Sequence, residues 1–323
     1  MDPQSTQEII RKWLGKLTKL NPATGRNGAG KAPHKPLLLL CLIEMADEGD
    51  LAGRTITRTA GLVLRFKSFS AIVSDRWPSR LDIRYPFYHL KTQAFWEPFT
   101  VEMESASSPD NCFACELNAE FFEVLQDANF RTKAKLLIIS RYFEPRERIA
   151  LFESMGVAVP DKSLFLREVS GLNHDAEEAA RKKGRSARFA VQIVSQYKFT
   201  CALTGLCCMT TDGATIVDAA HIEPWAVSQN DDLGNGIALS KNAHWAFDEG
   251  LWSVDDSGRI LVTSTRFVEV GGEQLKLQPY SGRFLQFANG VSLRPSPQSF
   301  IQHRVFHSIC STTESGSTTR RNR

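Results

Sequence analysis

The spacing of apolar residues predicts a first half built mainly from helices. Residues 7–20 place apolar side chains at helical intervals, which is typical of an amphipathic helix. Residues 34–47 are strongly apolar, so we expect a buried helix there. Residues 74–99, rich in Pro, Arg and aromatic residues, are predicted as a structured loop region with short strands. Further helices are predicted at residues 59–73, 119–130, 133–142 and 175–194.

The pattern changes in the second half. Residues 215–220 (TIVDAA) predict a short strand, and a loop containing Pro224 follows. Residues 236–239 begin a helix, or a strand leading into one, and residues 242–248 are predicted to be helical. Short strands separated by turns are predicted at residues 251–254, 260–263 and 267–270. These patterns together predict an α+β protein.

The length of 323 residues favours two domains. We expect a first domain over residues 1–156, a linker and connecting helix over 157–185, a second domain over 186–310 and a polar, disordered tail over 311–323. No apolar run approaches the roughly 20 residues of a membrane helix, so no membrane is expected. The seven cysteines are irregularly spaced and the first residues contain no apolar secretory segment, which predicts a cytoplasmic protein.

Charge adds a candidate partner. The net charge is only +3, but residues 54–91 contain eight Lys or Arg against two Asp. A second basic cluster lies at residues 181–188. Such clusters suit a polyanion, although a basic face that only meets solvent has the same pattern.

Four residues of the second half have a spacing that suits phosphodiester hydrolysis. His221 follows the predicted strand, Asn235 comes next, and His244 and Asp248 lie four residues apart on one helical face. An imidazole and a carboxylate placed in this way can hold a hard divalent cation, Mg²⁺ or Mn²⁺, while a neutral histidine takes a proton from water. Asp218 is a candidate third metal ligand, provided that a bulge or the strand end turns it toward His221.

The stretch AHIEPW…NGIALSKNAHWAFDEGL resembles the HNH nuclease family, whose fold is the ββα-metal unit. The resemblance covers about residues 201–264 and implies His221 as general base, His244 and Asp248 as metal ligands and Asn235 as a supporting residue. Many members of the family have Asp or His directly before the catalytic histidine, where this chain has Ala220, so Asp218 is expected to substitute. The two CxxC pairs that bind zinc in many members are absent, and no structural zinc site is expected.

Two motifs of the first half, APHKPLLLLCLIEM and RYPFYHL, resemble the sulfur-binding domain of modification-dependent (type IV) restriction endonucleases. That domain recognises phosphorothioate DNA. The resemblance implies an apolar wall for sulfur beside cations that hold the DNA backbone, and His89 falls where a small wall residue is expected. The candidate DNA-binding residues are His34, Lys35, Arg80, Arg84, Tyr85, Pro86 and His89.

The sequence therefore predicts a mainly helical DNA-reading domain followed by an HNH nuclease domain. The predicted activity is endonucleolytic cleavage of double-stranded DNA carrying phosphorothioate marks, in restriction or defence. Two alternatives stay open: an HNH restriction endonuclease that reads methylated or hydroxymethylated cytosine, and a DNA-binding protein with an inactive nuclease domain. A single metal site cuts one strand, so double-strand cleavage predicts a homodimer or two sequential nicks.

Overall fold

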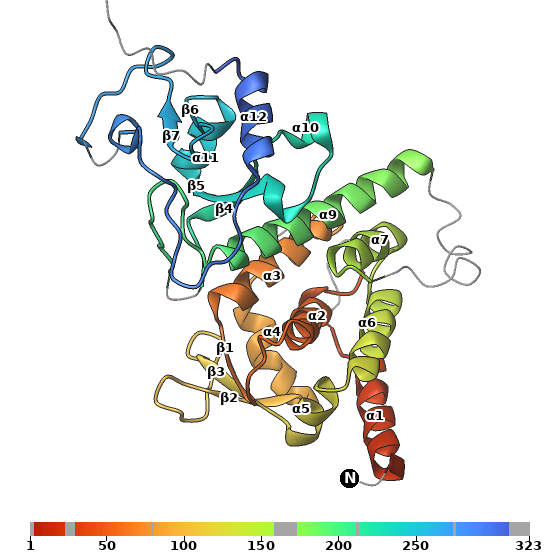
Figure 1. Cartoon of the computed structure of the whole chain (residues 1–323). Coiled ribbons are helices and arrows are strands. Elements are labelled where there is room, and N and C mark those ends of the chain that lie inside the picture. Colours follow the sequence, from red (N-terminus) through yellow and green to blue (C-terminus); the bar gives the residue numbers. More distant parts are fainter. Residues whose placement is uncertain are drawn as a thin grey trace, which may run out of the picture. The chain divides into compact units, whose positions relative to one another are not determined.

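The computed structural model describes residues 3–22, 30–78, 81–157, 173–210, 213–273 and 276–309 (Figure 1). The chain divides into two compact units, one formed by residues 1–191 with 209–214 and the other by residues 192–208 with 215–323. The long helix α9 (His174–Gln196) contains the boundary. The predicted tail at 311–323 and residues 158–172 of the predicted linker lie outside the described residues. None of the helices described is long and apolar enough to cross a membrane.

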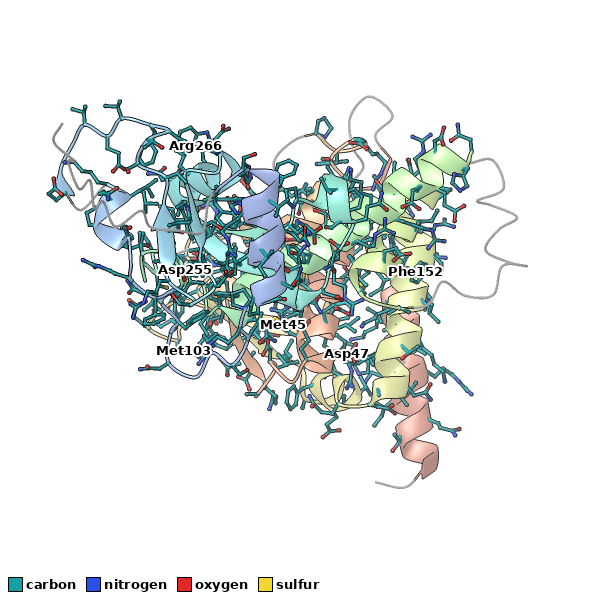
Figure 2. The ribbon with its side chains drawn as sticks, turned by 45° about the horizontal axis from the view of Figure 1, so that its top comes forward. Met45, Asp47, Met103, Phe152, Asp255 and Arg266 are labelled. Atoms are coloured by element: carbon teal, nitrogen blue, oxygen red, sulfur yellow. The ribbon has the colours of Figure 1, made fainter. Side chains whose placement is uncertain are left out.

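The first unit is built around α2 (His34–Asp47), whose ten residues from Pro36 to Met45 are all buried. A helix that is apolar all round must be enclosed, and α2 packs against three other helices of its unit. Lys135 and Arg131 pair with the carboxylate of Asp47 at the end of α2 (Figure 2). The other helices of this unit are α1 (Pro3–Thr18), α3 (Ala60–Ile72), α4 (Arg84–His89), η1 (Leu90–Gln93), α5 (Ala119–Leu125), α6 (Ala128–Tyr142) and α7 (Pro145–Ser154).

A three-stranded antiparallel sheet completes the first unit, in the order β1-β3-β2. Its strands are β1 (Thr55–Thr57), β2 (Trp96–Phe99) and β3 (Ala114–Leu117). Residues 84–89, predicted to be loop or strand, instead form helix α4. Pro86 is the third residue of α4, within the first turn, where a proline costs no helical hydrogen bond.

The second unit is α+β, as predicted, with two small antiparallel hairpins. Strands β4 (Val217–His221) and β5 (Gly236–Ser240) pair residue by residue, and β6 (Trp252–Val254) pairs with β7 (Ile260–Val262). Asp255 closes the turn of the second hairpin by accepting the backbone N–H groups of Ser257 and Arg259 (Figure 2). The helices of this unit are α10 (Trp225–Ser228), η2 (Leu233–Asn235), α11 (Lys241–Asp248), η4 (Gln278–Tyr280) and α12 (Pro297–Phe306).

The strand predicted at residues 267–270 does not form. Val268 and Val270 are 90% and 95% exposed, so the apolar side chains that suggested a buried strand face solvent. A strand needs a partner as well as a suitable sequence, and the ladder that is recorded for the neighbouring hairpin ends at Val262.

Candidate active site

The candidate site is built on the β4–β5–α11 unit (Figure 1). The antiparallel register places His221, the last residue of β4, opposite Gly236, the first residue of β5. Asn235 therefore lies directly beside the end of β4. Because α11 begins immediately after β5, His244 and Asp248 lie on the helix that follows the hairpin. The strand-strand-helix order expected from the sequence is present.

His221 contacts a carboxylate that the sequence analysis did not single out. Its Nε2 lies 2.9 Å from Oδ1 of Asp231, and the two side chains are 20% and 23% exposed. Asp231 belongs to the loop between α10 and η2, ten residues along the chain from His221. An Asn-Asp-Asp run in a loop is ordinary turn sequence, so only the folded loop distinguishes Asp231 from its neighbours.

Asn235 fixes the path of the chain behind His221. Its side chain is buried, with 1% of the residue exposed. The Oδ1 atom accepts the backbone N–H of Glu223 at 2.8 Å, and Nδ2 donates to the carbonyls of Glu223 and Asn230 at 3.2 and 3.0 Å. Its own carbonyl accepts the N–H of Ile222. Asn235 thus closes the loop that carries Asp231, which gives the supporting role expected from the sequence a physical form.

His244 and Asp248 meet on α11. The Nε2 atom of His244 lies 3.4 Å from Oδ2 of Asp248, and the Asp248 side chain is 60% exposed. Burial raises the pKa of Asp248 above its ordinary value, while His244, His307 and His221 act in the opposite direction. His307, which directly follows α12, lies against Gly250, two residues after Asp248 in the chain.

Asp218 and His221 lie on opposite faces of β4. The β4–β5 pairing is continuous from Val217 to His221, so the bulge that would turn Asp218 toward His221 does not occur. In a regular strand, residues three apart point to opposite faces. The carboxylate of Asp218 instead pairs with Nζ of Lys241 at 2.6 Å. The structure therefore gives Asp218 a partner on the face opposite His221.

A divalent cation fits His244 and Asp248. Both side chains project from one face of α11, and their polar atoms are already close enough to share an ion. Within the described ranges no group of three or more His, Cys, Asp or Glu residues could hold a metal. The protein would thus supply two ligands from α11, leaving the remaining positions to water and substrate oxygens, which is usual for Mg²⁺.

His303 is a structural histidine of the second unit. It is 1% exposed and stacks on Phe247, with ring centroids 3.8 Å apart and an interplanar angle of 8°. Its Nε2 lies 3.1 Å from the carbonyl of Phe247, so Nε2 carries the proton, and Nδ1 accepts the Ser253 hydroxyl at 3.0 Å. Burial lowers the pKa of His303 to about 3, which keeps the ring neutral.

The predicted DNA-reading residues belong to the first unit, and several of them lie together. The rings of Tyr85 and His89, one turn apart on α4, stack at 6.4 Å, and both residues are exposed. Burial lowers the pKa of His89, and the charges of Lys35 and Lys91 act in the same direction. Nζ of Lys91 lies 3.8 Å from the centre of the neighbouring Tyr88 ring. Pro86, on the same helix, is buried, and Arg80 lies outside the described residues.

The other two predicted reader residues have protein partners. The ring of His34 meets Trp77 edge-on at 5.7 Å, and burial lowers the pKa of this histidine. The guanidinium of Arg84 binds Asp82 at 2.6 Å and Asp110 at 2.7 Å. Arg84 therefore carries less free charge toward DNA than its sequence position implied.

Ion pairs also neutralise much of the two basic clusters found in the sequence. In the first, Arg54 pairs with Glu116 at 2.9 Å and Arg76 with Glu147 at 2.8 Å, while Arg65 is buried between two carboxylates. In the second, the ion pairs are Arg181–Glu177, Lys183–Asp75 and Arg185–Glu178. Paired cations attract a polyanion weakly, so neither cluster is a strong DNA-binding surface by charge alone.

The six cysteines among the described residues are free thiols. Cys112 and Cys115 are buried in the first unit with their sulfurs 3.9 Å apart. Cys201 is buried in the second unit, whereas Cys207 and Cys208 are exposed.

Comparison with known proteins bears on the second unit. A model of the HNH endonuclease family matches residues 201–255, the segment that contains β4, β5, α11 and β6. No curated protein matches the chain. A solved structure described as "Modification dependent TagI restriction endonuclease" is similar at 19% identity and a TM-score of 0.31, covering 41% of this chain and 41% of that chain. This chain thus spans less than half of that solved chain. Residues 201–255 thus match an HNH endonuclease domain, and all of them except 209–214 belong to the second unit of the chain.

Proposed function

We propose that the chain is a DNA endonuclease in which His221 is the general base and His244 and Asp248 hold the catalytic metal. The observation that carries the proposal is the joint arrangement of the His221–Asp231 pair at the end of β4 and the His244–Asp248 pair on α11. Helix α11 packs against β4 as well as β5, which supports a single site formed by both pairs.

The tautomer of His221 decides which nitrogen acts as the base. When Nε2–H donates to the ionised carboxylate of Asp231, the ring lone pair lies on Nδ1. Nδ1 takes a proton from water as the water oxygen bonds to phosphorus and the bond from phosphorus to the leaving sugar oxygen breaks. Asp231 then stabilises the imidazolium that forms. The loop closed by Asn235 keeps Asp231 and His221 in register throughout.

HNH nucleases generally use a divalent metal ion, and we propose Mg²⁺ or Mn²⁺ here. When bound, such an ion supplies positive charge that stabilises the scissile phosphate and the leaving oxygen. His244 and Asp248 are the residues that would hold it. The raised pKa of Asp248 in the metal-free protein fits a partly buried carboxylate, and a neighbouring cation would favour its charged form.

We propose modified DNA as the substrate, with phosphorothioate the favoured mark, in a restriction or defence role. The support is the exposed Tyr85–His89 stack on α4, together with Lys35, whose Nζ lies 3.5 Å from Oε1 of Gln93 in the following η1. Sulfur is larger and less strongly hydrated than oxygen, so an apolar surface accepts it more readily than a charged oxygen. Because His89 stands in the stack, the apolar surface includes an imidazole where a small residue would leave more room.

Plasmid cleavage tests this function. Matched plasmids with and without phosphorothioate, together with methylated and hydroxymethylated plasmids, are incubated with the full chain in Mg²⁺ or Mn²⁺, with His221→Ala as the control. We expect only the phosphorothioate plasmid to be cut, and only by the wild-type protein. If only a base-modified plasmid is cut, the proposed nuclease activity stands, but the proposed phosphorothioate specificity is wrong. If no plasmid is cut in either metal, the proposed function is wrong. If the His221→Ala variant cuts DNA, His221 is not the general base.

A further inference from the structure

The helix α1 carries a basic groove in the first unit. The groove has a volume of about 770 Å³ and is lined by Arg11, Lys12, Lys16 and Lys19, with Gly15 between them. Glu8 is the single acidic residue among its described lining residues. The sequence analysis used residues 7–20 only as an amphipathic helix, so this surface has no part in the function argued so far.

Helical geometry aligns these cations. Lys12 and Lys16 lie four residues apart on one face of α1, and Lys19 follows in the turn directly after the helix. The neighbouring face of α1 buries Trp13 and Leu17 in the core of the unit. Like charges at this spacing destabilise an isolated helix, so the stripe is held in place by core packing and not by its own interactions.

Most of the positive charge in the groove remains available to a ligand. Lys12 pairs with Glu120. Over the parts of the chain that the structure describes, no carboxylate forms an ion pair with Arg11, Lys16 or Lys19. Lys16 instead lies 4.2 Å from the centre of the Trp13 ring. In the clusters at residues 54–91 and 181–188, by contrast, many of the cations form ion pairs with carboxylates.

The groove is continuous with one of the predicted reader residues. Gln93 lines the groove and donates from Nε2 to the carbonyl of Lys19 at 3.1 Å. The same side chain accepts Nζ of Lys35 at 3.5 Å through Oε1. Gln93 belongs to η1, which begins directly after His89, so Lys35 extends the positive charge of α1 toward the Tyr85–His89 stack.

We infer that the α1 groove is a second DNA contact of this unit, which holds the phosphate backbone of the duplex presented to the Tyr85–His89 stack. The inference rests on the proposed function, since it concerns the same DNA. Arg11 to Lys19, along α1 and the turn that follows it, spans roughly 12 Å at about 1.5 Å per residue. One strand of duplex carries a phosphate about every 3.4 Å of axis, so the stripe matches three or four phosphates. A stripe of point charges without apolar side chains between them suits a backbone, whose charge does not depend on base sequence.

Salt dependence of binding tests the groove. Binding of the full chain with His221→Ala to an unmodified fluorescent duplex is measured in EDTA at several salt concentrations. The parent is compared with a variant that adds Arg11→Gln, Lys16→Gln and Lys19→Gln. Each phosphate contact contributes about 0.9 to the slope of log K against log salt, so we expect the slope to fall by about 2 to 3. The matched control replaces the exposed Lys133, Arg141 and Arg146 of α6 and α7 with Gln and should keep the parent slope.

A second pair of variants separates lost binding from lost folding. A side chain added at Gly15 meets no other atom within 4 Å, and replacing a helical glycine favours the helix. Gly15→Glu should therefore fold and weaken duplex binding at least tenfold by repelling phosphate, whereas Gly15→Gln, of the same size, should weaken it less. An unchanged slope in the triple variant, or equal binding by Gly15→Glu and Gly15→Gln, would overturn the inference.

The outcomes also separate this inference from the proposed function. If the wild-type protein cuts plasmid but the triple variant keeps the parent salt slope, the proposed nuclease activity is supported and DNA binding by the α1 groove is refuted. The opposite result is that the protein cuts no plasmid, while the triple variant loses salt-dependent duplex binding. In that case DNA binding by the α1 groove is supported and the nuclease proposal fails. Vesicles rich in phosphatidylserine form a third arm. Groove-dependent binding to vesicles without binding to duplex would make the partner a membrane and overturn the inference.

Discussion

Oδ1 of Asp231 lies 2.9 Å from Nε2 of His221, so a loop carboxylate fixes the imidazole at the end of β4. We predict that Asp231→Asn lowers kcat by about 100- to 10,000-fold, the usual cost of losing general-base catalysis when the histidine adopts the wrong tautomer. The amide can present its N–H to Nε2, which favours the opposite tautomer and removes the lone pair from Nδ1.

Kinetics distinguish this positioning role from a general structural one. Asp231→Asn should lower kcat while KM and duplex affinity in EDTA stay at wild-type values, and Asp231→Glu should recover part of the rate. Plasmid nicking under saturating DNA and metal gives kcat directly. Equal losses in kcat and in DNA binding would show that Asp231 only holds the loop together.

The position of Asp218 allows a sharp test of the metal ligands. We predict that Asp248→Asn weakens Mn²⁺ binding by tenfold or more, because a neutral amide replaces a charged ligand. Asp218→Asn is the matched control: it removes the same charge from a carboxylate already paired with Lys241, so Mn²⁺ affinity should be unchanged. Calorimetric titration of the DNA-free protein measures both. A large loss of Mn²⁺ affinity in Asp218→Asn would show that Asp218 is a metal ligand after all.

The buried amide of Asn235 predicts a large stability effect. Asn235→Ala removes three hydrogen bonds and leaves the groups of Glu223 and Asn230 without their partner. Each unsatisfied buried group costs about 1–3 kcal/mol, so we expect local destabilisation of about 3 kcal/mol. The rate of hydrogen exchange in peptides from residues 222–235 measures this local destabilisation. Asn235→Asp can still accept from Glu223 but cannot donate to the two carbonyls, and should also open the loop. Exchange at the wild-type rate in both variants would contradict this account.

The DNA-reading surface leads to a prediction about discrimination. Tyr85→Ala removes half of the Tyr85–His89 stack. Aromatic contacts contribute about 0.5–1.5 kcal/mol, so the preference for phosphorothioate over ordinary duplex should fall by about 2- to 13-fold. Phe113→Ala, at another exposed aromatic of the first unit, is the control and should keep the preference. Competition binding with the two duplexes measures both variants, and an equal effect at the two positions would exclude Tyr85 as the reader.

The sequence predicted those parts of the fold that local pattern determines. Helix α2 begins and ends at the residues predicted, because its apolar run and flanking polar residues leave no alternative. The β4–β5–α11 order was expected from the resemblance to the HNH family, whereas the pattern at residues 236–239 alone left helix or strand open. Helix α4 was missed because a segment rich in aromatics and proline has little helical periodicity, and its six residues are set by packing against the core.

The candidate site was predictable only in part, for a similar reason. His244 and Asp248 share a helix, so their spacing in sequence already fixes their spacing in space. Asp231 and His307 reach the site through a loop and a distant helix, and their proximity depends on tertiary structure that spacing does not encode. Charge was misleading where partners are remote in sequence: Arg76 and Glu147 are 71 residues apart.

The neutral, buried His303 makes the stability of the second unit depend on pH. Its pKa is lowered from 6.5 to about 3 in the folded protein, so the unfolded chain binds a proton that the folded chain does not. The stabilising contribution is complete above pH 6.5 and is lost as pH falls toward 3, at about 1.4 kcal/mol per pH unit. Between pH 7 and pH 5 the loss is about 2 kcal/mol. His303→Gln does not titrate, and its side chain can still donate to the Phe247 carbonyl. We expect hydrogen exchange in α11 and β6 to accelerate less for this variant than for the wild-type protein on acidification. The same acceleration in both proteins would assign the acid sensitivity to other groups.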